Sequence, residues 1–317
     1  IDSVYAGAEL CRKMGINLII AMGGGSVIDC SKAIAAQANY YGDVWQDLYV
    51  EQKLNTLTSA LPVASILTLA ATGSEMNGNS VISNMHTNQK LAIGHDLLRP
   101  VFSILDPEYT FTVNQYHTAA GVVDILSHLF EQYFTPDQEG YLQNRLMEAM
   151  MKTVIEYGPI AYNELDDYEA RANLMWTSSL ALNGMVTYGK VSTDWATHGM
   201  EHELSAFYDI THGVGLGILT PYWMKYVLSE ENVHRFVEYG KNVWNLDGEN
   251  NMEIANKAIN KTREFFSSLG IPSTLKEVGI DESKLDKMAE QATMFGALGS
   301  MKKLYKEDVL AIYKMAL

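Results

Sequence analysis

Asp124 and His128 are the residues whose types and spacing first suggest chemistry. They lie four positions apart in the mostly apolar stretch His117–Phe134, which predicts a buried helix with both side chains on one face. An ionised carboxylate is rarely left in apolar surroundings without a cation or a hydrogen-bond donor. The pair therefore favours a metal site over a surface Asp–His hydrogen bond.

A second group of candidate ligands lies further along the chain. Three of the eight histidines, His198, His202 and His212, fall within fifteen positions. A capping or core role is the usual explanation for any single histidine. Imidazole combined with carboxylate suits Zn, Fe or Ni, however, and the grouping beside an Asp-x-x-x-His helix predicts a divalent-metal site.

Two different sites are compatible with these histidines. Residues 198–202 match the H-x-x-E-H pattern, in which both histidines bind zinc and Glu201 activates water in a metallopeptidase. In the alternative, His202 is a proton carrier beside the metal, and the ligands are Asp124, His128, His198 and His212. The alternative explains more of the chain, because a peptidase has no need of the glycine-rich turn near the N-terminus.

That turn follows a predicted buried strand. The apolar run Ile16–Met22 ends in Gly23-Gly24-Gly25-Ser26, and an apolar helical face follows. Such a turn lets the backbone and the first N–H groups of a helix approach a pyrophosphate, although a purely structural turn is equally common. Thr68 and Thr72 lie at and just after the end of the next apolar run, Leu61–Leu69, and two such turns favour a nucleotide.

The elements that must position these residues fall into two parts. Three short apolar runs, the last at residues 100–105, alternate with helical patterns and predict a parallel α/β sheet. Helical periodicity dominates after Pro107, over residues 117–134, 141–157, 168–184, 231–245 and 252–269. We therefore predict an α/β dinucleotide-binding domain at residues 1–107 and a helical metal-binding catalytic domain at residues 108–317.

Composition narrows the classes of partner. The 317 residues carry 23 basic and 38 acidic side chains, a net charge of −15, which disfavours binding to nucleic acid or to anionic membranes. No apolar stretch approaches the roughly 20 residues of a membrane span. Two cysteines, Cys11 and Cys30, exclude a disulfide framework, and a cytoplasmic location is expected.

The sequence resembles the iron-containing (group III) alcohol dehydrogenase family, in its butanol-dehydrogenase-like, NAD(P)H-dependent aldehyde reductase branch. The resemblance covers essentially the whole chain. Its segments are Gly-Gly-Gly-Ser-Val-Ile-Asp at 23–29, Ala-Thr-Gly-Ser-Glu-Met-Asn at 71–77, Leu-Asp-Pro-Glu-Tyr-Thr at 105–110, Gly-Val-Val-Asp-Ile-Leu-Ser-His at 121–128, Ala-Leu-Asn-Gly at 181–184 and Asp-Trp-Ala-Thr-His-Gly-Met-Glu-His-Glu-Leu at 194–204. It implies the dehydroquinate-synthase-like fold, with the active site between the two domains.

The resemblance also implies roles for single residues. The metal would be Fe²⁺ or else Zn²⁺, and its ligands would be Asp124, His128, His198 and His212. His202 would lie near the nicotinamide without binding the metal. The residues implied to contact NADP or NAD are Gly24, Gly25, Ser26, Thr68, Thr72, Asn79 and Lys90. The implied reaction transfers hydride between this cofactor and an alcohol or aldehyde such as butanal, in a homo-oligomer, expected to be a dimer. A zinc polyol dehydrogenase of the same fold is the alternative.

Family members begin about 70 residues earlier, with a further strand–helix portion that helps to hold the adenosine. The present sequence starts at Ile1, within a helical pattern. We therefore expect weakened cofactor binding and an exposed sheet edge or apolar patch beside Ile16–Met22, with a tendency to self-associate.

Overall fold

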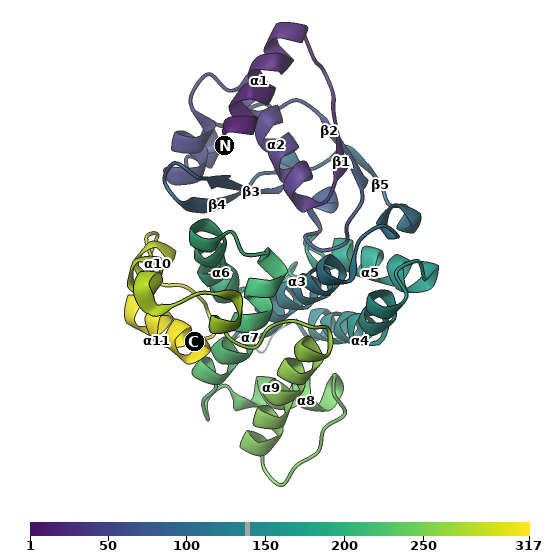
Figure 1. Cartoon of the computed structure of the whole chain (residues 1–317), viewed down its shortest axis with the longest axis vertical. Coiled ribbons are helices and arrows are strands. Elements are labelled where there is room, and N and C mark those ends of the chain that lie inside the picture. Colours follow the sequence, from purple (N-terminus) through teal and green to yellow (C-terminus); the bar gives the residue numbers. More distant parts are fainter. Residues whose placement is uncertain (137–139) are drawn as a thin grey trace.

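The computed structural model describes residues 1–136 and 140–317, with an α/β part above a helical part in the view of Figure 1. The α/β part contains a parallel sheet in the order β1-β2-β5, formed by β1 (Ile19–Gly23), β2 (Val63–Leu67) and β5 (Phe102–Ile104). Each apolar run identified in the sequence overlaps one of these strands. The predicted parallel sheet is thereby confirmed.

The predicted strand, glycine turn and helix are also present. Helix α2 (Gly25–Asn39) begins two residues after the end of β1, and it packs on both β1 and β2. A Cβ atom at Gly25 would lie 2.4 Å from Thr72 Oγ1, so the close approach of the two turns requires glycine there. The strand end and the loop after β2 therefore lie side by side, as ligand binding in an open α/β sheet requires.

A β-hairpin that the sequence analysis did not identify follows this loop. It pairs β3 (Asn79–Asn84) with β4 (Gln89–Gly94) in antiparallel register, and Asn88 adopts the left-handed conformation in its turn. Helix α1 (Asp2–Met14) packs against α2. Strand β4 contacts helix α6 of the helical part, so the hairpin connects the two parts of the molecule.

The remaining helices of the described chain are α3 (Gln115–Tyr133), α4 (Tyr141–Asn163), α5 (Tyr168–Ala181), α6 (Ala196–Tyr208), α7 (His212–Val227), α8 (Val233–Asn242), α9 (Asn251–Ser268), α10 (Leu285–Ala292) and α11 (Lys306–Ala316). Every predicted helix is present. The predicted end at residue 157 was wrong, because α4 continues through Pro159. Gly158 packs against Val122 of α3, so tertiary contact holds the helix together beyond its proline.

Helix α3 is the centre of the helical part. It is buried from Thr118 to Tyr133 and packs against α4, α5 and α7. A Cβ atom at Gly213 would lie 2.0 Å from the Ala120 carbonyl oxygen, so the start of α7 approaches the α3 backbone as closely as only glycine permits. This contact places His212 beside Asp124.

One face of the parallel sheet is apolar and exposed. Helix α2 covers the opposite face, whereas Ile20, Met22, Phe102 and Ile104 are 44–65% exposed. The register aligns Ile20 and Phe102 on either side of Ala64, which makes these residues one continuous surface, called the apolar sheet face below. The predicted apolar patch is therefore confirmed. Within the described residues, the helices are too short or too polar to cross a membrane.

Candidate active site

A cavity of about 1390 Å³ lies between the α/β part and the helical part. It is lined by the glycine turn after β1, by the threonine-containing turn after β2, by strands of the hairpin and by α3, α6 and α7. Every site residue predicted from the sequence lines it: Gly24, Gly25, Ser26, Thr68, Thr72, Asn79, Lys90, Asp124, His128, His198, His202 and His212. Residues as far apart in the sequence as Gly24 and Gly213 thus meet around one space.

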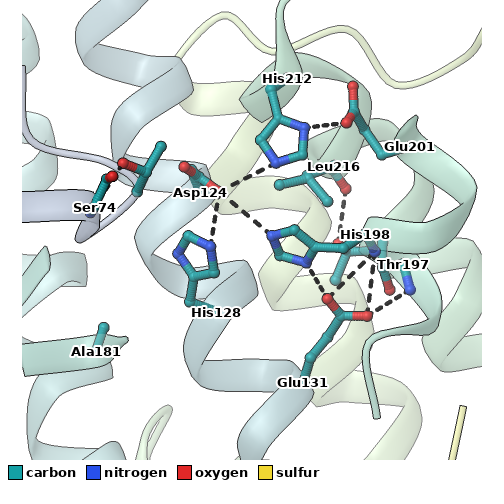
Figure 2. Close-up of polar contacts among 12 residues, drawn as sticks. Ser74, Asp124, His128, Glu131, Ala181, Thr197, His198, Glu201, His212 and Leu216 are labelled. Carbon is teal, nitrogen blue, oxygen red and sulfur yellow. Dashed lines mark hydrogen bonds and ion pairs between the residues drawn. The ribbon is translucent and has the colours of Figure 1, made fainter. Parts of the chain in front are cut away.

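Three histidine rings converge on one oxygen of Asp124 (Figure 2). The Nε2 atoms of His128, His198 and His212 lie 3.6, 3.7 and 3.7 Å from Asp124 Oδ1. His128 comes from the same helix as Asp124, one turn on, and the other two rings come from α6 and the start of α7. These separations are too long for hydrogen bonds.

The donor set fits a small divalent cation. Asp124 Oδ1 and His198 Nε2 are buried without a hydrogen-bond partner in the described structure, which is costly unless a cation satisfies them. Asp124, His128 and His198 each offer a ligand atom within 4.8 Å of the other two, and His212 adds Nε2 at 3.7 Å from Asp124 Oδ1. One carboxylate with three imidazoles also suits Fe²⁺ or Zn²⁺ chemically.

Carboxylates hold the opposite ring nitrogens of two of these histidines. Glu131 Oε2 contacts Nδ1 of His198, and Glu201 Oε2 contacts Nδ1 of His212. Both contacts fix the ring orientation and direct Nε2 towards Asp124. The sequence analysis missed both roles. The position of Glu131, three residues after His128 and on the same face of α3, could have indicated its role in the sequence.

The ionisable groups of the cluster shift one another's pKa values. Burial would raise the pKa of Asp124, but the fields of His128 and of the other two histidines outweigh burial and hold that pKa below its usual range. Burial lowers the pKa of His128 to about 3, so this ring is neutral. Burial also opposes the charged form of His198, yet neighbouring Glu131 raises its pKa to about 10, so a cation would bind at Nε2 only by displacing the proton there while Glu131 keeps the proton at Nδ1.

His202 lies beside this cluster. Its ring centroid is 5.7 Å from that of His212, whereas the described structure places no nitrogen of His202 within ion-pair distance of Asp124. Burial, and then the charge of Lys90, lowers the pKa of His202 well below 6.5. The ring is therefore neutral.

The pattern H-x-x-E-H does not form a zinc-peptidase site here. Glu201 is fully buried, and its oxygens are occupied by Ser205 Oγ, His212 Nδ1 and Lys90 Nζ. A carboxylate held in this way is not available to activate water between His198 and His202. This geometry disfavours the metallopeptidase alternative.

A buried lysine holds the nucleotide turns together. Lys32 of α2 is fully buried, and its Nζ lies 2.7–3.3 Å from oxygens of Ser74 and Asn77, in the loop after β2, and of Asn79, at the start of β3. Asp29, one turn earlier, accepts the backbone N–H of Val81. Asn79 therefore contributes its carbonyl to this network in addition to lining the cavity.

Lys90 joins the two parts of the molecule. It lies in β4, and its Nζ is 3.0 Å from Ser205 Oγ and 3.4 Å from Glu201 Oε2, both in α6. Its Nζ is also 3.3 Å from His212 Nδ1. Lys90, which is predicted to contact the cofactor, thus stands at the boundary between the predicted cofactor-binding turns and the predicted metal ligands.

Two family models match the chain. The model described as iron-containing alcohol dehydrogenase matches residues 1–107, and the model described as the C-terminal part of the Fe-containing alcohol dehydrogenase family matches residues 118–317.

Relatives with assigned activities are similar along nearly the whole chain. NADH-dependent butanol dehydrogenase A of Clostridium acetobutylicum is 56% identical over 317 residues, which cover 99% of this chain and 80% of the relative. The NADPH-dependent aldehyde reductase YqhD of Escherichia coli is 37% identical over 93% of this chain and 76% of its own. A crystal structure of NADH-dependent butanol dehydrogenase A from Thermotoga maritima superposes with a TM-score of 0.93 at 37% identity, covering 99% of this chain and 79% of that one.

Proposed function

The chain belongs to the iron-containing alcohol dehydrogenase family, and we propose that it catalyses metal-dependent hydride transfer between NAD(P)H and a small-to-medium aliphatic aldehyde such as butanal. It is an NAD(P)H-dependent alcohol dehydrogenase or aldehyde reductase, as its relatives at 37–56% identity are. The observation that carries the proposal is the convergence of Asp124 Oδ1 and three imidazole Nε2 atoms in a cavity that also contains the glycine turn.

The roles of the residues follow from this arrangement. Residues 1–107 bind the cofactor through the turns, with contacts from Gly24, Gly25, Ser26, Thr68, Thr72, Asn79 and Lys90. Residues 108–317 bind the metal through Asp124, His128, His198 and His212. Glu131 and Glu201 orient two of the metal-binding rings from the far side.

When bound, the divalent cation supplies a Lewis acid that polarises the aldehyde carbonyl, and the nicotinamide supplies the hydride. The chain itself holds both partners around one cavity and orients them. Neutral His202 stands beside the cluster, where its unprotonated ring nitrogen can accept and pass on a proton as the alcohol forms or is consumed.

Four finer points belong to the proposal. The metal is Fe²⁺, with Zn²⁺ as the alternative that the same ligands accommodate. The cofactor is NADP or NAD. The protein is a homodimer. It works in the cytoplasm, which fits two cysteines that are both free.

Two histidine variants and an assay test this function. We expect the wild-type protein to contain one divalent ion per chain by elemental analysis, and to oxidise NADH or NADPH when butanal is added. His212→Ala should lose the ion and the activity, because one of four ligands is removed. His202→Ala should keep the ion and turn over more slowly, with a shifted pH profile.

Full metal content in His212→Ala would refute the ligand assignment. Loss of metal from His202→Ala, with His212→Ala unaffected, would instead place the cation on the H-x-x-E-H pair. Failure of the metal-loaded wild-type protein to oxidise either cofactor with any aldehyde would refute the activity.

A further inference from the structure

The residue before α6 has an unusual backbone conformation at the edge of the metal cluster. Trp195 has φ 63° and ψ 15°, the left-handed region. Of the other described non-glycine residues with positive φ, all are Asn, Asp or Gln. A bulky side chain rarely adopts this conformation, and such outliers cluster at active sites and ligand clamps.

The surrounding structure enforces the conformation from two sides. The backbone N–H of Asp194 donates to the Glu131 carbonyl oxygen of α3 at 2.7 Å. The Asp194 carboxylate accepts the backbone N–H groups of Ala196, Ser300 and Met301 at 2.7–3.1 Å. The turn that carries Trp195 is therefore fixed between α3 and the loop before α11.

This turn places the indole against the predicted metal ligands. The Trp195 ring lies edge-to-face with His198, with centroids 5.2 Å apart, and 6.2 Å from His128. Its one polar atom, Nε1, donates to Thr193 Oγ1 at 2.8 Å within its own turn. The indole therefore contributes apolar surface to the cavity beside the cluster, as do Leu182 and Val113 elsewhere in the lining.

From this geometry we infer that Trp195 is a specificity-determining residue that forms the wall against which the alkyl chain of the aldehyde packs. The inference rests on the proposed function and specifies its substrate class. An unbranched alkyl chain gains apolar contact with the indole. Hydroxyl groups of a polyol or hydroxyaldehyde lose their hydrogen bonds to water there and receive none in return. A branched chain is expected to meet the indole, because the hydrogen bonds of Asp194 fix the backbone that carries it.

Two substitutions of graded size test the wall. Trp195→Gly removes the ring and adopts the left-handed conformation without strain, and Trp195→Phe retains a smaller aromatic wall. The matched control is Trp176→Ala, which removes an exposed tryptophan of α5 that does not line the cavity. For each metal-loaded protein we would measure metal content and the catalytic efficiency, kcat/KM, with butanal, 2-ethylhexanal and glyceraldehyde. We would also measure the calorimetric Kd of butyramide in the presence of NADH.

We expect Trp195→Gly to raise the catalytic efficiency with 2-ethylhexanal, relative to that with butanal, by about 10-fold or more. It should also reduce the preference for butanal over glyceraldehyde and weaken butyramide binding. Trp195→Phe should change each quantity in the same direction by less, and Trp176→Ala should match the wild type.

Unchanged substrate ratios in a Trp195 variant that retains its metal would overturn the inference and leave the proposed function intact. If Trp195→Gly loses its metal, unchanged substrate ratios in Trp195→Phe would overturn the inference instead. A wild-type protein that reduces glyceraldehyde as efficiently as butanal would also overturn it, whereas one that reduces no aldehyde would overturn the proposed function itself.

Discussion

Each histidine of the metal cluster faces Asp124, and two of the three are constrained at both ring nitrogens. Asp124 faces the Nε2 side of three rings, and Glu131 and Glu201 hold the Nδ1 side of two of them. Glu131 also accepts the backbone N–H groups of Thr197 and His198, so one carboxylate fixes both the ring and the start of α6. The second layer of carboxylates therefore determines ring orientation, and through it the affinity for the cation.

Replacing Glu131 by Gln should weaken metal binding by about 10- to 100-fold, because the amide no longer favours the proton at His198 Nδ1. Competition titration against a chelator measures this affinity. The control is Glu148→Gln, which alters another buried glutamate, bound to Tyr133 and Asn242 away from the cluster. Equal metal affinity in the two variants would show that Glu131 has no orienting role.

At the scale of elements, the nucleotide turns depend on the lysine of α2. The loop from Ser74 to Asn79 presents several oxygens to Lys32 Nζ, and Asp29 on the same helix ties the start of β3 to α2. A single buried ammonium thus joins α2, the loop after β2 and the hairpin. The glycine turn before α2 and Thr72 of the loop are held in register by this network.

We predict that Lys32→Met destabilises the protein by about 3–5 kcal/mol, because buried oxygens lose their shared cation. The Kd for NADH should rise as well, because the loop that carries Thr72 is released. Chemical denaturation and a fluorescence titration measure the two effects. Lys13→Met, at an exposed position of α1, is the control and should alter neither quantity.

Helix α6 contains a titratable group that makes stability depend on pH. Burial, reinforced by the charge of Glu201, raises the pKa of Glu203 from 4.5 to about 8. The folded protein therefore retains this proton up to about pH 8, whereas the unfolded chain releases it above about pH 4.5. The contribution of Glu203 to stability is complete below pH 4.5 and is lost as pH rises towards 8.

Glu203→Gln should remove this dependence, because an amide is neutral throughout the window. The variant should gain stability relative to the wild type as pH rises from about 4.5 to 8, which denaturant unfolding at both ends of the window measures. Glu156→Gln changes the net charge equally at an exposed site of α4 and controls for charge alone. A constant difference between Glu203→Gln and the wild type across the window would contradict the prediction.

At the scale of the whole molecule, the two faces of the parallel sheet differ. Helix α2 covers one face, and the apolar sheet face is open, whereas the cavity at the strand ends joins the sheet to the helical part. Figure 1 shows α1 and α2 together beside the sheet, away from β5. A contiguous exposed apolar surface of this kind favours association with another molecule.

The double variant Ile20→Thr and Phe102→Thr should reduce self-association, because it places hydroxyl groups on the apolar sheet face while retaining side chains suited to strands. Sedimentation velocity at several protein concentrations measures the change, and circular dichroism checks that the fold is kept. The control, Val191→Thr, changes an exposed apolar residue of the helical part. Equal association of both variants would show that the sheet face is not the contact surface.

Local sequence determined the parts of this protein that depend on near neighbours in the chain. Helical periodicity places Asp124 and His128 one turn apart on α3, whatever α3 packs against. The run Ile16–Met22 with its glycine turn specifies a strand followed by a helix. The candidate ligands and both turns could therefore be identified from residue types and spacing, before the family resemblance supplied their roles.

Tertiary structure decided which of these residues act together. The H-x-x-E-H spacing puts His198 and His202 on one face of α6 in any fold, but the packing of α6 and α7 on α3 determines that His198 and His212 reach Asp124. The partners of Lys32 lie 42–47 residues away, beyond any local pattern. Contacts between distant segments depend on how surfaces fit and on which buried polar groups must be satisfied, and neither is encoded in a short stretch of chain.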